Sequence, residues 1–246
     1  MHIEILTEDN SGQRLLEHLM PELIGQNGEP HSWRSHAYRG IGRIPTDLST
    51  SADPSKRVLL DQIRRLLRGD AKTPAIDAVV VVLDTDVRDC KKFLSELRSP
   101  AASCNATNLT LFRLAIEEME AWYLGDRAAL QRAYPKAKMR ALDRYMQDSI
   151  CGPWELVADA VHPGGSRAIH RVGWSLPGQI KRGWADRIGP LLDPEINLPP
   201  ASANCETDYG GWPPRRPRVI PLPSEQPIAE WIIQGCSAIT VTQTEI

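Results

Sequence analysis

The stretch AVVVVLDTD, residues 78–86, decides the fold. Its first six residues are apolar and mostly β-branched, and they lack the polar alternation of a strand with one solvated face. This pattern predicts a central strand that is buried on both sides. The strand runs directly into Asp84-Thr85-Asp86, so two carboxylates are expected at its carboxyl end, where open α/β sheets place their ligands.

Strands and helices alternate on either side of this stretch. Ile3 and Ile5 alternate with polar neighbours and predict a first strand. Helices are predicted at about 12–24, 54–68 and 90–97, and a third strand at 109–116. Because such alternation implies parallel pairing, the carboxyl ends of the three strands should meet on one side. We therefore predict an α/β fold of the Rossmann-like type, a mostly parallel sheet flanked by helices.

The polar segment between the first two helices, residues 31–54, is predicted to be an irregular loop. Arg34, Arg39 and Arg43 lie in it together with two glycines, and the last two arginines are candidate nucleic-acid contacts. Such a loop could hold a polyanion, but the same composition is typical of a solvated variable loop. The sequence leaves both interpretations open.

Composition narrows the class of protein. The 246 residues are 41% hydrophobic and 24% charged, which is typical of a globular chain with one sizeable core. The five cysteines form no CxxC pair, so neither a zinc site nor a disulfide framework is predicted. No apolar run approaches the roughly 18 residues of a membrane span, and we expect a cytoplasmic protein without a membrane partner. The net charge of −2 leaves room for local basic patches.

Acidic residues follow each of the three predicted strands and should converge at one edge of the sheet. Carboxylates packed together repel one another and raise their own pKa values unless a cation neutralises them. Mg²⁺, with Mn²⁺ as an alternative, is the natural cation because it prefers oxygen ligands and can assist displacement at a phosphodiester. The candidate metal ligands are Glu8, Asp84, Asp86, Glu118 and Glu120, and the first three are the candidate catalytic residues.

Each carboxylate also has a structural interpretation. Glu8, Asp86 and Asp89 each precede a predicted helix, where a carboxylate can simply stabilise the helix N-terminus. Glu117 is expected to be a solvated companion of its acidic neighbours. Asp84 is harder to explain in this way, because it ends a buried strand, where an unpaired charge is costly.

Three segments together resemble the Toprim-related domain of unknown function 4276 family of bacteria. They are LTE at 6–8, VLDTD at 82–86 and LAIEEMEAW at 114–122, and the resemblance runs to about residue 197. It implies a Toprim fold, in which a Glu after the first strand and a DxD after a later strand bind Mg²⁺, as in topoisomerases, primases and the nucleases associated with overcoming-lysogenization-defect proteins. In this chain Glu8, Asp84 and Asp86 match those positions, and Glu118 and Glu120 match the Glu-x-Glu-Ala-Trp segment of the family.

The function that the resemblance implies is a Mg²⁺-dependent nuclease or phosphodiester-processing subunit that acts on nucleic acid, with an AAA-type ATPase partner in a defence-type system. Family members usually have Gly directly after the first Glu and a second Glu shortly downstream, whereas this chain has Asp9 and Gly12. The alternative is a non-catalytic nucleic-acid-binding or assembly subunit with a degenerate metal site. A phosphatase with Asp84 as nucleophile is a third possibility.

The segments at 152–156 and 178–190 resemble the helical C-terminal portion of the same family. Lys181 and Arg187 lie in the second segment and are candidate nucleic-acid contacts, although they could equally be surface cations on a helix. We therefore divide the chain into a Toprim-like α/β core at 1–145, a helical portion of the same domain at 146–197, and a tail at 198–246.

The tail, rich in proline, is predicted to be irregular and foreign to the fold. In a shifted reading frame, the codons of residues 201–211 permit the peptide Leu-Arg-Asp-Gly-Leu, which the family has at this point. We hypothesise a frameshift near Leu198. The nucleotide sequence tests it, because a shifted frame without that peptide would exclude the hypothesis.

Overall fold

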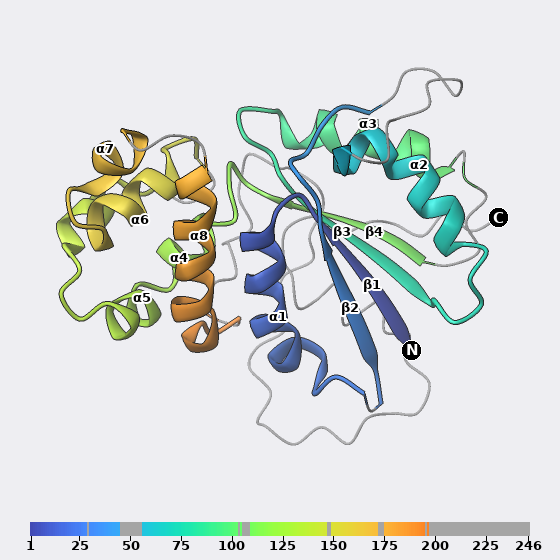
Figure 1. Cartoon of the computed structure of the whole chain (residues 1–246), viewed down its shortest axis with the longest axis horizontal. Helices are drawn as coiled ribbons and strands as arrows, with labels where there is room; N and C mark the ends of the chain where they lie inside the picture. Colours follow the sequence, from blue (N-terminus) through green and yellow to red (C-terminus); the bar gives the residue numbers. More distant parts are fainter. Residues whose placement is uncertain are drawn as a thin grey trace.

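Figure 1 shows the fold of the chain in a computed structural model. The structure describes residues 1–28, 30–44, 56–102, 104, 109–146, 149–171, 175–194 and 196. The predicted tail at 198–246 and the frameshift proposed near Leu198 lie outside the described residues. So does much of the predicted loop, at residues 45–55.

A parallel sheet of four strands forms the centre of the fold. Its strands are β1 (His2–Thr7), β2 (Ser32–Ala37), β3 (Ala78–Asp84) and β4 (Leu109–Ala115), in the order β2-β1-β3-β4. The predicted α/β fold with a parallel sheet is confirmed. The chain leaves β1 towards β2 and then crosses back to β3 on the other side of β1. The carboxyl ends of β1 and β3 therefore flank a topological switch point, where open α/β sheets bind their ligands.

Helices cover both faces of the sheet (Figure 1). α2 (Leu59–Asp70) and α3 (Cys90–Ala102) lie on one face, where Leu6 belongs to the same core cluster as Leu60. α1 (Asn10–Ile24) lies on the other face, where Ile5 shares a core cluster with Leu15. This division follows from the alternation of side chains along a strand.

Helix boundaries differ from the predicted ones by a few residues. α1 begins at Asn10 rather than 12, because the Asp9 carboxylate accepts a hydrogen bond from the Gly12 N–H and caps the helix. α2 begins at Leu59 rather than 54 and continues past Gly69 to Asp70. α3 extends beyond residue 97 to Ala102.

A helical module follows β4 and packs against α1 (Figure 1). It consists of α4 (Ala121–Gly125), α5 (Arg127–Ala133), η2 (Met139–Arg144), α6 (Pro153–Val161), α7 (Gly165–His170), α8 (Ser175–Ile188) and η3 (Gly189–Leu191). Trp184 of α8 is buried in the same core as Leu16 of α1, and Arg14 forms an ion pair with Asp186. No helix in the described part of the chain is long and apolar enough to span a membrane.

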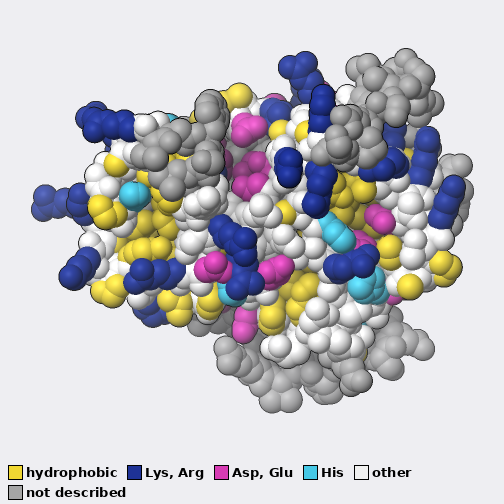
Figure 2. All heavy atoms as spheres, in the orientation of Figure 1, with side chains coloured by type: hydrophobic (Ala, Val, Ile, Leu, Met, Phe, Trp, Pro, Cys, Tyr) yellow, Lys and Arg dark blue, Asp and Glu magenta, His cyan; other side chains and the backbone are white. Residues whose placement is uncertain are grey.

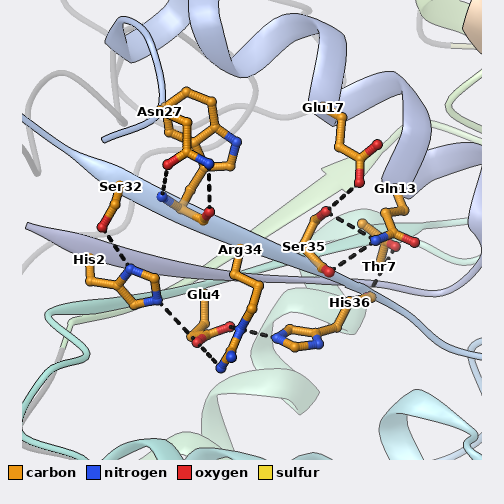
Figure 3. Close-up of polar contacts among 11 residues, drawn as sticks. His2, Glu4, Thr7, Gln13, Glu17, Asn27, Ser32, Arg34, Ser35 and His36 are labelled. Atoms are coloured by element: carbon orange, nitrogen blue, oxygen red, sulfur yellow. Dashed lines mark hydrogen bonds and ion pairs between the residues drawn. The ribbon is translucent and has the colours of Figure 1, made fainter. Parts of the chain in front are cut away.

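The edge strand β2 lies inside the segment that was predicted to be irregular, so that prediction is wrong for residues 32–37. Its only buried residue is Trp33, which explains the missing apolar pattern. The Asn27 side chain hydrogen-bonds to both the N–H and the carbonyl oxygen of Trp33, at 3.0 and 3.1 Å. The Gln13 amide donates to the carbonyl oxygen of Ser35 at 2.9 Å (Figure 3). Side-chain amides thus hydrogen-bond to backbone groups on the outer side of β2, the side that faces away from β1.

Candidate acidic site at the carboxyl edge of the sheet

The segments that follow β3 and β4 are joined by hydrogen bonds that place the acidic residues. The Thr85 N–H donates to the carbonyl oxygen of Ala115 at 2.9 Å, which extends the pairing of the two strands by one step. The Asp84 carboxylate then accepts a hydrogen bond from the Met119 N–H at 3.0 Å. Asp84 is therefore held against the turn that carries the Glu-x-Glu segment.

Glu8 follows β1 on the other side of Asp84. Its carbonyl oxygen accepts a hydrogen bond from the Gly40 N–H at 2.8 Å, which fixes the backbone next to β2. Asp9, not Glu8, caps α1, so the structural role considered for Glu8 belongs to its neighbour. The Oε2 atom of Glu8 is shielded from solvent and has no hydrogen-bond partner among the described residues. An orphaned carboxylate oxygen of this kind is suited to a cation.

Lys181 reaches the acidic residues from α8. Its ammonium lies 3.1 Å from Glu120 Oε2 and 3.4 Å from Glu118 Oε1, and only 17% of its side chain is exposed. The interpretation of Lys181 as a surface cation is therefore wrong. Glu118 also accepts a hydrogen bond from the Trp154 N–H at 3.2 Å, so α6 contacts the site as well.

Burial and mutual repulsion raise the pKa values of the carboxyl groups at the rim of the cluster. Burial raises the pKa of Glu8 to about 7, and the negative charges of Asp9 and Asp86 add to this effect. Burial likewise raises the pKa of Glu118 to about 7, with a further contribution from Glu120. Each group is poised to exchange a proton for a cation near neutral pH.

Within the acidic cluster, Asp84 and Glu120 are the buried carboxyl residues, at 8% and 3% exposed. Burial raises the pKa of Asp84 well above its usual range, and repulsion from Glu8 and Glu120 adds to this. Burial also raises the pKa of Glu120, although Lys181 opposes it. Burial disfavours the charged form of Lys181, but the surrounding carboxylates outweigh it and raise the pKa of the ammonium.

Asp86 lies outside the buried cluster, although it was predicted to be a ligand beside Asp84. Half of its side chain is exposed, and its carboxylate pairs with Arg88 at 2.8 Å. Its backbone has φ 49°, a left-handed conformation that turns the chain away from β3. Asp89 accepts a hydrogen bond from the Lys92 N–H at 2.8 Å, consistent with the helix-stabilising role considered for it.

Glu117 was expected from the sequence to be a solvated companion of its neighbours, but it has a structural role. Its carboxylate accepts hydrogen bonds from the N–H groups of Cys151 at 2.6 Å and Gly152 at 2.9 Å. Glu117 therefore anchors the residues that precede α6, and through them it supports the position of the helical module beside the site.

The other predicted nucleic-acid contacts lie at different distances from the cluster. Arg39 is exposed and directly precedes Gly40, whose N–H bonds to Glu8, so it lies beside the site. Arg43 is exposed farther along the same loop. Arg187 is exposed on α8, and its guanidinium lies over the Tyr134 ring at 4.4 Å from the centroid.

Figure 2 shows acidic side chains gathered in a recess between the helical module and the half of the molecule that carries α2 and α3, with basic side chains on the α2 and α3 side. No protein-family model, curated protein or solved structure matches the chain. The resemblance to the Toprim-related family therefore stays a prediction, and the site is assigned from its own geometry.

The donors of the cluster suit a hard divalent cation in chemistry and charge. Four carboxylates, those of Glu8, Asp84, Glu118 and Glu120, lie around one ammonium, so the acidic groups outnumber the basic one. The orphaned oxygen of Glu8 fits the same requirement. Within the described ranges, no three His, Cys, Asp or Glu side chains already stand in a metal-binding arrangement. Cation binding therefore requires side chains of the cluster to reorient.

A second polar cluster lies on the face of the sheet towards α2 (Figure 3). Its centre is Glu4 of β1, whose side chain is 3% exposed. Arg34 contacts its carboxylate at 2.6 Å, His36 at 2.6 Å and His2 at 3.2 Å. Burial opposes ionisation of Glu4, but these partners outweigh it and lower its pKa. Sequence reasoning missed this cluster because it depends on the pairing of β1 with β2.

Proposed function

We propose that the chain is a Mg²⁺-dependent nuclease or phosphodiester-processing subunit that acts on nucleic acid. The observation that carries this proposal is the group of four carboxylates that lies around a single ammonium at the carboxyl edge of the sheet, beside its switch point. Burying carboxylates without matching cations is unfavourable for folding, and clusters of this kind mark functional sites more often than structural ones.

Glu8 and Asp84 are the residues that would hold the ion, because they end neighbouring strands on either side of the switch point. A bound Mg²⁺ would polarise a phosphodiester and orient a water molecule for in-line attack. Asp86 is close enough to Glu8 to raise its pKa, so it lies near the cluster and completes the proposed catalytic set. Lys181 keeps Glu118 and Glu120 in place.

Exposed arginine side chains beside the cluster support the proposal that the substrate carries phosphate groups. Arg39 lies next to the backbone of Glu8, and Arg88 pairs with Asp86. Nucleic-acid backbones are bound mainly by such arginine and lysine side chains. Arg43 and Arg187 are further candidate contacts. The ATPase partner and the defence-type system rest on the sequence resemblance alone.

A non-catalytic role in binding or assembly is the second candidate, and two contacts favour it. The ion pairs of Lys181 already neutralise part of the cluster. In addition, a Cβ at position 12 would lie 2.9 Å from the Sδ atom of Met119, so the second glutamate of the family pattern would require the Met119 side chain to move. In this case metal would serve structure only.

Cleavage assays with Mg²⁺ or Mn²⁺ on single- and double-stranded DNA and RNA would separate the two candidates. We expect Asp84→Asn and Glu8→Gln to lower cleavage by more than the roughly 10- to 100-fold loss that changes around a metal site cause. Asp143→Asn, at an exposed aspartate in η2, is the matched control and should retain activity. Cleavage that survives both site substitutions would remove the proposed site, and wild-type protein that binds metal without cleaving would support the second candidate.

A further inference from the structure

Lys181 is a fixed part of the acidic site rather than a mobile surface group. It extends from α8, which is held to α1 by the buried Trp184 and by the ion pair of Arg14 with Asp186. Its side chain is 17% exposed. A lysine this well shielded from water keeps its charge only beside carboxylates, so the ammonium and its partners form one unit.

The cluster has two halves that differ in how their charge is satisfied. The ion pairs of Lys181 within the described residues are those with Glu118 and Glu120, at 3.4 and 3.1 Å. Glu8 and Asp84 form the other half, where Glu8 Oε2 has no hydrogen-bond partner among the residues described. One half therefore already contains a cation, and the other half does not.

The number of cations that the cluster can take follows from these two halves. A metal ion at about 2.1 Å from the oxygens of Glu118 or Glu120 would lie against the ammonium, and the two positive charges would repel each other. Among the described residues Glu8 and Asp84 form no ion pair with the ammonium, so one divalent ion can lie between them without displacing it.

We propose that Lys181 takes the place that a second metal ion would fill, so that the site holds one divalent cation, between Glu8 and Asp84. This inference rests on the proposed function in that the cluster must bind a divalent cation. The lysine supplies a permanent positive charge on the side of Glu118 and Glu120, whatever the metal concentration. Metal-dependent activity should then follow the occupancy of a single ion.

Counting bound Mn²⁺ tests the proposal without any activity measurement. We would titrate the full chain with MnCl₂ by calorimetry and count bound ions by electron paramagnetic resonance. The wild type and Lys181→Arg should each bind one Mn²⁺, and Lys181→Gln should bind two, with a spin coupling between the ions. Lys136→Gln, at an exposed lysine, is the matched control and should bind one. Two ions in the wild type, or one ion with unchanged affinity in Lys181→Gln, would overturn the proposal.

The position of the single ion gives a second test that does not depend on the folding of the lysine variant. Glu8→Gln should lower Mn²⁺ affinity at least about 10-fold, whereas Glu118→Gln should leave one ion bound. If Glu118→Gln loses the ion and Glu8→Gln keeps it, the placement is wrong. If no protein binds Mn²⁺, the proposed metal-dependent function fails as well, which is distinct from a wrong count. Thermal melting of each variant shows whether it is folded.

Discussion

The carboxylates of Glu4 in β1 and of Glu8, which directly follows β1, have opposite surroundings. Glu4 is contacted by Arg34, His36 and His2, and these partners lower its pKa. Glu8, four residues later, has a buried oxygen without a partner and a pKa raised to about 7. The first carboxylate is matched by cations and fastens the edge strand β2 to β1. The second is unmatched and lies at the switch point of the sheet.

The difference separates a carboxylate that stabilises the fold from one that burial leaves short of favourable contacts. A protein gains stability from a buried carboxylate only when hydrogen bonds and cations replace its lost water. Glu4 meets this condition entirely within the sheet. Asp84 does not, because its nearest charged neighbours include the negative Glu8 and Glu120. Perturbed carboxyl groups of this kind cluster at functional sites, and this supports the cation site proposed above.

The largest expected effect is a fall in stability with rising pH. Glu8 and Glu118 have folded-state pKa values of about 7, against 4.5 when unfolded, so the folded chain binds more protons between these values. Without divalent metal, the free energy of unfolding should therefore fall as pH rises from about 5 to 8, by about 2.5 kcal/mol for each group and about 5 kcal/mol for both. Urea unfolding in EDTA measures this, and Mg²⁺ should restore stability more at pH 8 than at pH 5.

Glu8→Gln is the control for this pH profile and should make the fall shallower. If the free energy of unfolding is independent of pH in both proteins, the negative charges of the cluster are already neutralised by groups of the protein. Glu4 should act in the opposite direction, because its pKa is lowered. Its contribution is fully present above about pH 4.5 and is lost as the pH falls below that value through the folded-state pKa.

A smaller effect is expected from Glu4→Gln. The neutral amide keeps the shape of the side chain but loses the charge-assisted hydrogen bonds with Arg34 and His36, so the free energy of unfolding at pH 7 should fall by about 2 kcal/mol. Asp143→Asn, at an exposed aspartate that pairs with Arg127, is the matched control and should change it by about 0.5 kcal/mol. Equal losses in both variants would remove the distinction between the Glu4 cluster and an ordinary surface pair.

The smallest expected effect is a gain in stability, in contrast to the losses above. Asp84→Asn keeps an oxygen for the Met119 N–H but removes a repelling charge, so in EDTA at pH 8 it should raise the free energy of unfolding by about 1 kcal/mol. The same substitution should abolish stabilisation by Mg²⁺. Chemical denaturation with and without Mg²⁺ measures both results. If Asp84→Asn instead lowers stability as much as Glu4→Gln, the Asp84 carboxylate is held by favourable contacts, as Glu4 is.

Much of the fold could be predicted from the sequence because its signals are local. The valine run of β3 indicates a strand buried on both faces, and its acidic end indicates which residues lie at the edge of the sheet. Parallel pairing then brings Glu8, Asp84 and the turn with Glu118 and Glu120 to the same edge. These steps need only the periodicity of apolar residues and the rule that strands alternating with helices pair in parallel.

The features that were missed depend on contacts between distant parts of the chain. β2 has the sequence SWRSHA, in which Arg34 and His36 occupy the positions that apolar residues fill in other strands. They are stable there because Glu4 lies opposite. Lys181 precedes Arg182, and nothing in the local pattern distinguishes the buried cation from its exposed neighbour. Its partner Glu118 lies 63 residues away along the chain.

The capped outer side of β2 has a consequence for how the chain can associate with others. Asn27 and Gln13 use their side-chain amides on the backbone groups that a fifth strand would need. A peptide or a second copy that extended the sheet at β2 would first have to displace these amides. The edge is thus insulated against strand addition, which protects a sheet whose outermost strand is short and largely polar from growing into a larger β-assembly.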